Sequence, residues 1–169
     1  QYWITEGYLP LRDYIADWQS RKSERQISAE DILMLNGSQQ GLDLVGKMFL
    51  NPSTPVLLEG PSYLGAIQAF SMYQPSFHHI NIHNGGPDVS EFHSAMKKLK
   101  PLLFYTVPNF QNPTGNTYDF FRREQLSNTD HSEETIWIED NPYGEIYFEK
   151  NQLPDFFSLS PERTIHLGS

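Results

Sequence analysis

The sequence predicts an α/β fold in which a mostly parallel β-sheet is sandwiched between helices. Short apolar runs alternate along the chain with segments that carry apolar residues at helical spacing. The run Leu102–Val107 is strongly apolar, as expected for a strand that is covered on both faces. Turn formers such as Asn36-Gly37 and Gly60-Pro61 close the runs. Strands and helices that alternate in this way are typical of a parallel sheet.

The helices are predicted from apolar residues that recur on one side of a helical turn. The first is an amphipathic helix, whose apolar face is expected to consist of Leu11, Tyr14, Ile15 and Trp18. The second carries Leu42, Val45, Met48 and Phe49 and ends at Asn51-Pro52. Further helices are predicted at Tyr63–Tyr73, at Val89–Leu99 with Asp88 or Ser90 as the N-cap, and at Thr117–Leu126.

The strands are predicted from short runs that are rich in apolar and β-branched residues. They are Asp31–Leu35, Pro55–Glu59, His79–Ile82, Leu102–Val107, Thr135–Glu139 and Arg163–Leu167. The segment Asn151–Pro161 has the composition of a loop. A single domain is expected, because a chain of 169 residues can bury about two thirds of its unfolded surface.

The composition argues against several classes of protein. The net charge of −9 and the scattered basic residues disfavour a general affinity for nucleic acid. The chain has no cysteine, which excludes disulfides and thiolate metal ligands and is compatible with a cytoplasmic location. No apolar run approaches the ~20 residues that span a bilayer. The histidines lack the paired spacing of a metal site, so no metal ligand is predicted. The densest basic groups are predicted to be solvated helix ends: Arg21, Lys22 and Arg25, and Lys97, Lys98 and Lys100.

Four polar clusters follow predicted strands directly, where ligands of parallel sheets bind. The first is Asn36–Gly41. A glycine turn before a helix leaves backbone N–H groups available to a phosphate, and Ser38 can add a hydrogen bond. The cluster matches neither the GxGxxG fingerprint nor a Walker A loop. A simple capped helix start is the alternative.

The second cluster is Glu59–Tyr63. Tyr63 lies just beyond a predicted strand end, where it can offer a flat face to an aromatic ring. The alternative is a tyrosine of the core or of its rim.

The third cluster is Asn109–Gly115, directly after the most apolar strand. Its Asn and Gln side chains can orient a ligand by hydrogen bonds. Because Asn-Pro and Thr-Gly pairs also form turns, a simple turn is the alternative.

The fourth cluster is Glu139–Glu145. A carboxylate at the end of a buried strand is costly unless it is paired or hydrogen-bonded. Asp140 therefore requires a partner, and a protonated ring nitrogen would serve. A helix cap, a turn cap and a metal ligand are the alternatives.

Taken in this order, the clusters resemble the fold type I pyridoxal-phosphate enzymes. The resemblance is to class I/II aminotransferases of the aminoadipate or aromatic kind, and to the related effector domains of MocR-type regulators. Gly7, Leu11 and Arg12 also resemble a run near the start of the family's large domain. The match covers essentially the whole chain, and NPTG followed by EDxPYGE is specific. The matching segments are Gly37–Gln40, Glu59–Tyr63, Phe110–Gly115 and Glu139–Glu145.

The resemblance implies that the chain contributes to a site for pyridoxal 5'-phosphate. Ser38 and Gln39 would hold the phosphate at a helix N-terminus, and Ser169 resembles a further serine that contacts it. The resemblance also marks Gly60–Pro61 and Asn112–Pro113 as the places to look for cis peptides.

The same resemblance assigns contacts to the pyridine ring. Tyr63 would stack on the ring, and Asn112 and Tyr143 would form hydrogen bonds with its phenolic oxygen. Asp140 would pair with the ring nitrogen and keep it protonated, so that the ring can accept electrons.

The sequence departs from the family at its end. The lysine that binds the cofactor covalently is expected a few residues after a Gly-Ser pair such as Gly168-Ser169, where this sequence stops. The family's basic residue near the phosphate, its arginine for the substrate carboxylate and its small C-terminal domain are also missing. Residues 1–169 are therefore expected to be a partial cofactor-binding large domain that does not catalyse transamination by itself.

The resemblance leaves several functions open for the parent protein. The first is an aminotransferase that moves an amino group from an amino acid to a 2-oxo acid, working as a homodimer. The second is a transcription regulator whose aminotransferase-like domain senses cofactor or an amino acid, and a winged-helix segment before Gln1 would favour it. A lyase or decarboxylase on the same fold and an unrelated α/β domain are further alternatives. The amino-acid sequence of residues 139–145, EDNPYGE, favours the aminotransferase.

Overall fold

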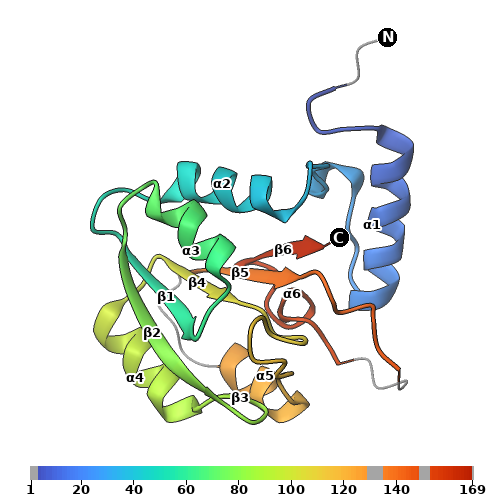
Figure 1. Ribbon diagram of the computed structural model, residues 1–169. Coiled ribbons are helices and arrows are strands. Elements are labelled where there is room, and N and C mark those ends of the chain that lie inside the picture. The colour runs from blue at the N-terminus through green and yellow to red at the C-terminus, as the bar shows by residue number, and fades with distance from the viewer. Residues whose placement is uncertain (1–3, 129–134, 149–152, 169) are drawn as a thin grey trace.

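The computed structural model describes residues 4–128, 135–148 and 153–168. These residues form a six-stranded sheet with helices on both faces (Figure 1). Its strand order is β3-β2-β1-β4-β5-β6, and all pairs are parallel except β2 with β3. The predicted fold class is therefore confirmed. The strands are β1 Pro55–Gly60, β2 Ser76–His83, β3 Gly86–Pro87, β4 Leu103–Thr106, β5 Ile136–Asn141 and β6 Thr164–Gly168.

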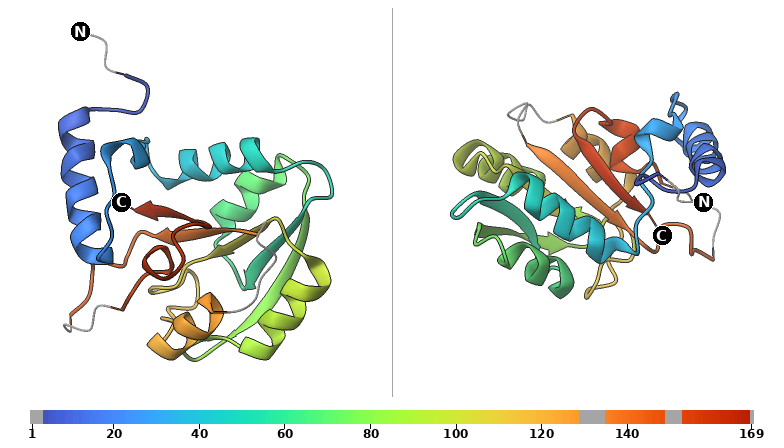
Figure 2. Two further views of the ribbon diagram at one scale, coloured as in Figure 1. Left: turned by 180° about the vertical axis from the view of Figure 1, so that it is seen from behind. Right: turned by 90° about the horizontal axis from the view of Figure 1, so that it is seen from above.

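The helices cover the sheet in two layers, and α1 stands beside it (Figure 2). In the described part of the chain, none of the helices is both long and apolar enough to cross a membrane. The helices are α1 Leu9–Ser23, the 3-10 helix η1 Ala29–Asp31, α2 Ser38–Phe49, α3 Leu64–Ser71, α4 Val89–Leu99, α5 Phe120–Ser127 and α6 Phe156–Leu159.

Alternating strand residues divide the core into two clusters, because successive side chains of a strand point to opposite faces. On the α2 face, Leu58 and Tyr105 pack with residues of α2 and α3. On the α4 face, Leu57, Phe104 and Trp137 pack with residues of α4, α5 and α6. The ring of Trp137 lies at the centre of the α4 face, with its centroid 5.1 Å from that of Phe104. Residues of β5 with even numbers, such as Ile138, thus belong to the α2 face.

At Gly46, helix α2 lies close to the ring of Tyr73, which follows the end of α3. A Cβ atom on Gly46 would lie only 2.6 Å from Cε2 of Tyr73. Gly46→Ala is therefore expected to lower the free energy of unfolding by about 1–3 kcal/mol, because overpacking outweighs the better helix propensity of alanine. Denaturant unfolding measures the change. Lys47→Ala, on the exposed side of the same helix, is the control and should stay within about 0.5 kcal/mol of the parent protein. A Gly46→Ala variant as stable as this control would contradict the close approach.

The predicted strand at Asp31–Leu35 is wrong. Asp31 ends η1, and the following residues run beside α1 without joining the sheet. Backbone carbonyls of this segment and of η1 accept from Arg12 of α1, which donates from Nε to Ile32 O at 2.8 Å and from Nη2 to Ala29 O at 2.5 Å. A short apolar run is compatible with either a strand or an irregular segment. Here the hydrogen bonds from Arg12 stabilise the irregular segment.

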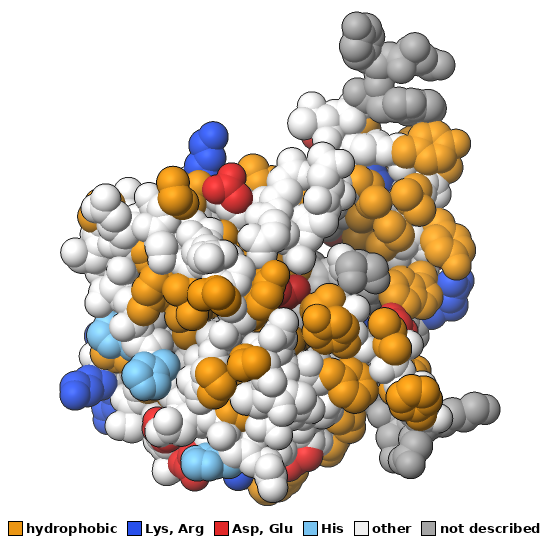
Figure 3. All heavy atoms as spheres, in the orientation of Figure 1, with side chains coloured by type: hydrophobic (Ala, Val, Ile, Leu, Met, Phe, Trp, Pro, Cys, Tyr) orange, Lys and Arg blue, Asp and Glu red, His pale blue; other side chains and the backbone are white. Residues whose placement is uncertain are grey.

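The helix predicted from Leu11, Tyr14, Ile15 and Trp18 is confirmed, but its predicted buried face is wrong. Leu11 and Tyr14 are 41% and 65% exposed, whereas Arg12 and Ala16 are buried. The helix is turned in this way because the Arg12 side chain reaches inward to the carbonyls near η1. Hydrophobic side chains consequently gather on the surface over α1, at the right of Figure 3.

The other predicted elements are confirmed, with some ends displaced. Helix α5 begins at Phe120 rather than Thr117, because Asp119 caps it by accepting from Arg122 N at 2.7 Å. Asp88 is the N-cap of α4, accepting from Glu91 N at 2.9 Å. Helix α6 lies within the segment that composition predicted as a loop, so that part of the prediction is wrong; residues 151 and 152 lie outside the described residues.

Candidate cofactor site

The predicted site residues lie at the carboxyl edge of the sheet. Strands β1, β4 and β5 are parallel neighbours, so the turns that follow them meet at this edge. The turn after β1 carries Tyr63, and the turn after β4 carries Asn112. Asp140 is near the end of β5, and Tyr143 follows in the next turn. Ser169 lies outside the described residues.

Helix α2 begins at this edge with Ser38 and Gln39. Gly37 is its N-cap, with φ of 95°, a left-handed conformation that favours glycine. In the part of the chain that the structure describes, no side chain caps this helix end, which suits it to an anion. Gln39 Nε2 donates to Tyr63 OH at 3.3 Å, so the first and second clusters of the sequence are in contact.

Gly65 provides the space in which Gln39 and Tyr63 meet. A Cβ atom on Gly65 would lie 2.4 Å from Gln39 Nε2 and 2.6 Å from Cε1 of Tyr63. Any larger residue would therefore displace the Tyr63 ring. The ring packs against the core cluster of the α2 face, which includes Tyr105.

Asp140 is buried, and its two carboxylate oxygens differ. Oδ2 accepts a hydrogen bond from Tyr105 OH at 2.7 Å, whereas Oδ1 has no hydrogen-bond partner among the described residues. Burial raises the pKa of Asp140, although the Tyr105 hydrogen bond and the charge of His166 oppose this. A buried carboxylate oxygen without a partner is costly. Oδ1 therefore fits a cationic N–H donor, such as a protonated ring nitrogen.

Asn112 and Tyr143 stay separate from this network. Asn112 is half-buried and Tyr143 is 38% exposed. Within the described ranges, no hydrogen bond joins either side chain to the other predicted site residues. The peptide bonds Gly60–Pro61 and Asn112–Pro113 are both cis, at the positions that the resemblance marked.

Several polar residues around the site were not predicted to have a role. Tyr105 was assigned only to a buried strand, yet its hydroxyl holds Asp140. Glu59 and Gln111 were each part of a quoted cluster, but they form a buried hydrogen bond with each other at 2.9 Å. The available signal was the presence of Glu59 within an apolar run, since a buried charge requires donors.

A group of charged side chains lies beneath the site on the α4 face. The ligand atoms of Glu139, Asp155 and His166 lie within 4.8 Å of one another. His166 Nδ1 is 3.1 Å from Glu139 Oε2, and Phe156 N and Phe157 N donate to the same carboxylate at 3.0 and 3.1 Å. Burial lowers the pKa of His166, but the hydrogen bond and charge of Glu139 outweigh it, and the pKa is raised. The group is thus an ion-pair cluster that histidine spacing in the sequence does not reveal.

Lys22 joins this cluster from α1. Its Nζ lies 2.7 Å from Glu145 Oε1 and 3.3 Å from Asp155 Oδ2, and its side chain is only 12% exposed. The prediction that Lys22 belongs to a solvated helix end is therefore wrong, because two carboxylates from later segments draw the ammonium group inward.

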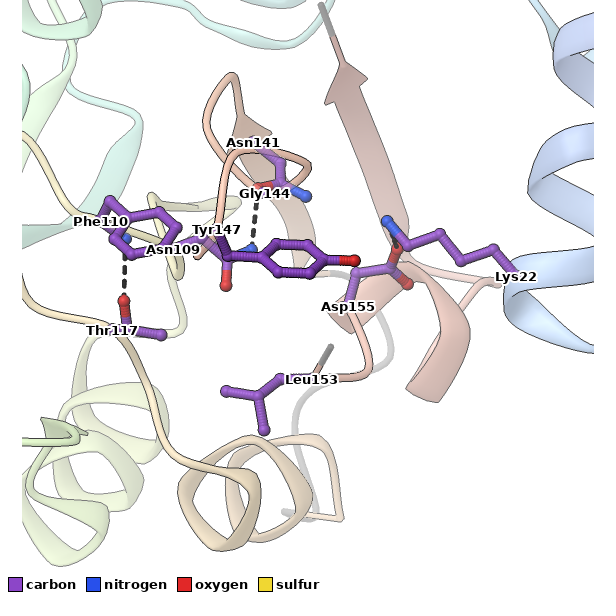
Figure 4. Close-up of a pocket in the computed structure, with 9 residues that line it drawn as sticks. All are labelled: Lys22, Asn109, Phe110, Thr117, Asn141, Gly144, Tyr147, Leu153 and Asp155. Carbon is purple, nitrogen blue, oxygen red and sulfur yellow. Dashed lines mark hydrogen bonds and ion pairs between the residues drawn. The ribbon is translucent and has the colours of Figure 1, made fainter. Parts of the chain in front are cut away.

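A cavity of about 40 Å³ lies beside the predicted cofactor site (Figure 4). Lys22 and Asp155 approach each other on one side of it, and Asn109 donates to Asn141 Oδ1 at 2.8 Å on the other. None of the predicted cofactor residues that the structure describes lines this cavity. It can hold a few water molecules at most and is too small for a cofactor.

Comparison with known proteins supports the resemblance seen in the sequence. No family model matches the chain. The chain is 41% identical to a 2-aminoadipate transaminase of Thermus thermophilus and 37% identical to an aromatic-amino-acid aminotransferase of Thermococcus litoralis; each match covers 100% of this chain and 42% of the relative. An uncharacterised HTH-type transcriptional regulator of Bacillus subtilis is 30% identical over 97% of this chain, which covers 34% of the regulator.

The fold agrees with these matches. The crystal structure of the α-aminoadipate aminotransferase LysN from Thermus thermophilus, complexed with N-(5'-phosphopyridoxyl)-L-leucine, superposes with a TM-score of 0.91 and 41% identity. The match covers 100% of this chain and 43% of that structure, so the chain spans less than half the length of the relatives it matches. By sequence and by fold, the chain is similar to part of the fold type I pyridoxal-phosphate-dependent aminotransferases.

Proposed function

We propose that residues 1–169 are part of the cofactor-binding large domain of an aminotransferase, and that the covalent lysine and the small domain lie beyond Ser169. The full-length protein would transfer an amino group from an amino acid to a 2-oxo acid. The relatives named for aminoadipate and aromatic amino acids support this reaction class. The proposal also includes that the full-length protein forms a homodimer and is located in the cytoplasm.

The observation that carries the proposal is the state of the Asp140 carboxylate. It is 2% exposed, one oxygen is fixed by Tyr105, and the other has no partner in the part of the chain that the structure describes. A protonated pyridine nitrogen is cationic and donates one hydrogen bond, which is what Oδ1 lacks. The cofactor, when bound, supplies an electron sink for the bonds at the substrate α-carbon.

The remaining predicted residues would bind and orient the cofactor. Ser38 and Gln39 would hold the phosphate with the backbone N–H groups of the first turn of α2. The contact between Gln39 and Tyr63 supports this role, because the stacking ring would then sit next to the phosphate site. Further contacts would come from Asn112 and Tyr143 to the phenolic oxygen and from Ser169 to the phosphate.

The visible absorbance spectrum of the full-length protein with pyridoxal phosphate tests the proposal. A band of protein-bound cofactor that changes when a mixture of amino acids is added would support an aminotransferase. A band that persists unchanged would favour a sensor domain. The absence of any band in a protein that has the downstream lysine would overturn the cofactor assignment.

The second candidate function is the effector domain of a transcription regulator. It is favoured by the 30% identity to the HTH-type regulator of Bacillus subtilis. A winged-helix segment upstream of Gln1 in the full-length sequence, together with binding to operator DNA that depends on the cofactor, would support it.

Tyr105 provides a direct test of how Asp140 is held. Burial and the charge of Asp140 raise the pKa of Tyr105, so its hydroxyl stays protonated and donates. Tyr105→Phe removes only this donor and is expected to weaken the affinity of the full-length protein for pyridoxal phosphate about tenfold, measured by absorbance titration. Tyr73→Phe is the control, because it removes a hydroxyl that donates to Asp43 Oδ1 at 2.8 Å outside the site. Equal affinities of the two variants would contradict the role of Tyr105.

A further inference from the structure

Glu59 is a buried carboxylate that the proposed chemistry does not use. It is 1% exposed and lies at the end of β1 on the α4 face, opposite to the face of Asp140. Its Oε1 accepts from Thr106 Oγ1 at 2.6 Å, Tyr118 OH at 2.7 Å and Val107 N at 3.0 Å. Its Oε2 accepts from Gln111 Nε2 at 2.9 Å. All four partners donate, so the position requires an acceptor on both oxygens.

Gln111 links this carboxylate to two turns. It is buried, and its Nε2 also donates to Pro61 O at 2.8 Å, in the turn after β1. Its Oε1 accepts from Thr114 N at 2.9 Å and from Thr114 Oγ1 at 2.7 Å, in the turn after β4. The orientation of the amide is fixed, because the Thr114 N–H can only donate and the Pro61 carbonyl can only accept.

The two turns carry two of the predicted cofactor residues. Tyr63 follows Pro61 by two positions, and Asn112 lies between Gln111 and Thr114. We propose that Glu59 is a positioning residue that acts through Gln111 to hold Tyr63 and Asn112 at the cofactor site. This inference rests on the proposed function, in which these two residues contact the cofactor ring. Among the described residues, no hydrogen bond joins Glu59 directly to Tyr63 or Asn112, and its side chain lies on the face of the sheet opposite to that of Asp140.

A glutamine at position 59 isolates the link, because it has the shape of Glu59 but cannot accept on both sides. Its oxygen can still serve Thr106, Tyr118 and Val107, and its amide nitrogen then faces Gln111 Nε2, donor against donor. Glu59→Gln therefore breaks the contact with Gln111 while keeping the other three. Gln111→Leu removes the link and its bonds to both turns.

Hydrogen exchange of the full-length protein without cofactor is the first measurement. The Thr114 N–H bonds to Gln111 and not to Glu59. Glu59→Gln is nevertheless expected to speed its exchange about tenfold, because the Gln111 amide loses its anchor. Unchanged exchange at Thr114 in this variant would overturn the proposal.

Affinity for pyridoxal phosphate, measured by absorbance titration, is the second measurement. Glu59→Gln and Gln111→Leu are each expected to weaken binding about tenfold. The double variant should bind no more weakly than Gln111→Leu alone, because residues that act through one contact are not additive. An additive loss of about a hundredfold would overturn the action through Gln111.

Thr135→Val is the matched control. It also removes a buried hydrogen bond, from Thr135 Oγ1 to Pro101 O at 2.7 Å, but at the opposite edge of the sheet. It should lower stability similarly and leave both Thr114 exchange and cofactor affinity unchanged. If Thr135→Val speeds Thr114 exchange equally, the effects arise from general destabilisation, and the positioning role is overturned.

If the parent protein binds no pyridoxal phosphate, the proposed function is overturned, and so is the positioning of cofactor residues. Thr114 exchange is measured without cofactor, so it still shows whether Glu59 acts on the turns through Gln111 even if the protein binds no pyridoxal phosphate.

Discussion

Asp140→Asn in the full-length protein is expected to lower kcat about 10²- to 10³-fold with an amino acid donor. Asparagine keeps the shape of Asp140 and can still accept the Tyr105 hydrogen bond through its oxygen. It would then present an amide N–H₂, rather than a negative charge, to the ring nitrogen. Steady-state kinetics at saturating pyridoxal phosphate measure the loss.

Asp43→Asn is the control for this variant, because it changes a carboxylate that accepts from Tyr73 at 2.8 Å away from the site. Its kcat should stay within a fewfold of that of the parent protein. An Asp140→Asn variant with full cofactor occupancy and the same kcat as this control would contradict the proposed role of Asp140.

The same substitution, Asp140→Asn, is expected to raise the stability of the protein without cofactor. Burial raises the pKa of Asp140 above that of the unfolded chain. Ionisation therefore costs stability as the pH rises from the unfolded pKa through the folded pKa. At neutral pH, Asp140→Asn should accordingly unfold at a higher denaturant concentration than the parent protein when both lack cofactor.

Arg123→Met is expected to lower the free energy of unfolding by about 3–5 kcal/mol. Arg123 is fully buried, and its guanidinium joins α5 to two loops, the one between β4 and α5 and the one before α6. It donates to Tyr118 O at 3.0 Å, Pro154 O at 3.1 Å, Pro108 O at 2.9 Å and Asn109 Oδ1 at 2.7 Å. Methionine fills much of the space but removes all four hydrogen bonds, and Pro108 O keeps its bond from Tyr118 N at 2.9 Å. Urea unfolding followed by circular dichroism measures the loss.

Its neighbour provides the control. Arg122 donates to one carbonyl, Pro87 O at 2.8 Å, from a partly buried position. Arg122→Met should therefore cost about 1 kcal/mol. Equal losses for the two variants would show that the number of acceptors served by Arg123 does not determine its contribution.

The fold was predictable to the extent that local patterns determine it. The apolar strand Leu102–Val107 and the helix Val89–Leu99 correspond to β4 and α4 with small or no shifts. Patterns failed where a distant partner decided the outcome. The burial of Arg12 depends on carbonyls 17 and 20 residues away, and no periodicity within α1 reveals them.

The candidate site, like the fold, was predictable from the sequence only in part. The clusters around Tyr63 and Asp140 were visible because turns and polar residues directly follow apolar strands. The residues that support them were not, since Glu59 meets Gln111 across 52 positions and Tyr105 meets Asp140 across 35. Such contacts depend on strand order and register, which sequence periodicity does not determine.

Glu139 and Asp140 are adjacent on β5 but serve opposite sides of the sheet. Glu139 accepts from the backbone of α6 on the α4 face, whereas Asp140 meets Tyr105 on the α2 face. This separation has a consequence for protein engineering. Selection for heat resistance can draw its substitutions from the aromatic layer around Trp137 and from α6, while a library for altered specificity can be confined to the other side. Provided that Glu59 and Gln111, which link the two sides, are kept, the two searches can be combined in one protein, because their substitutions are separated by the sheet.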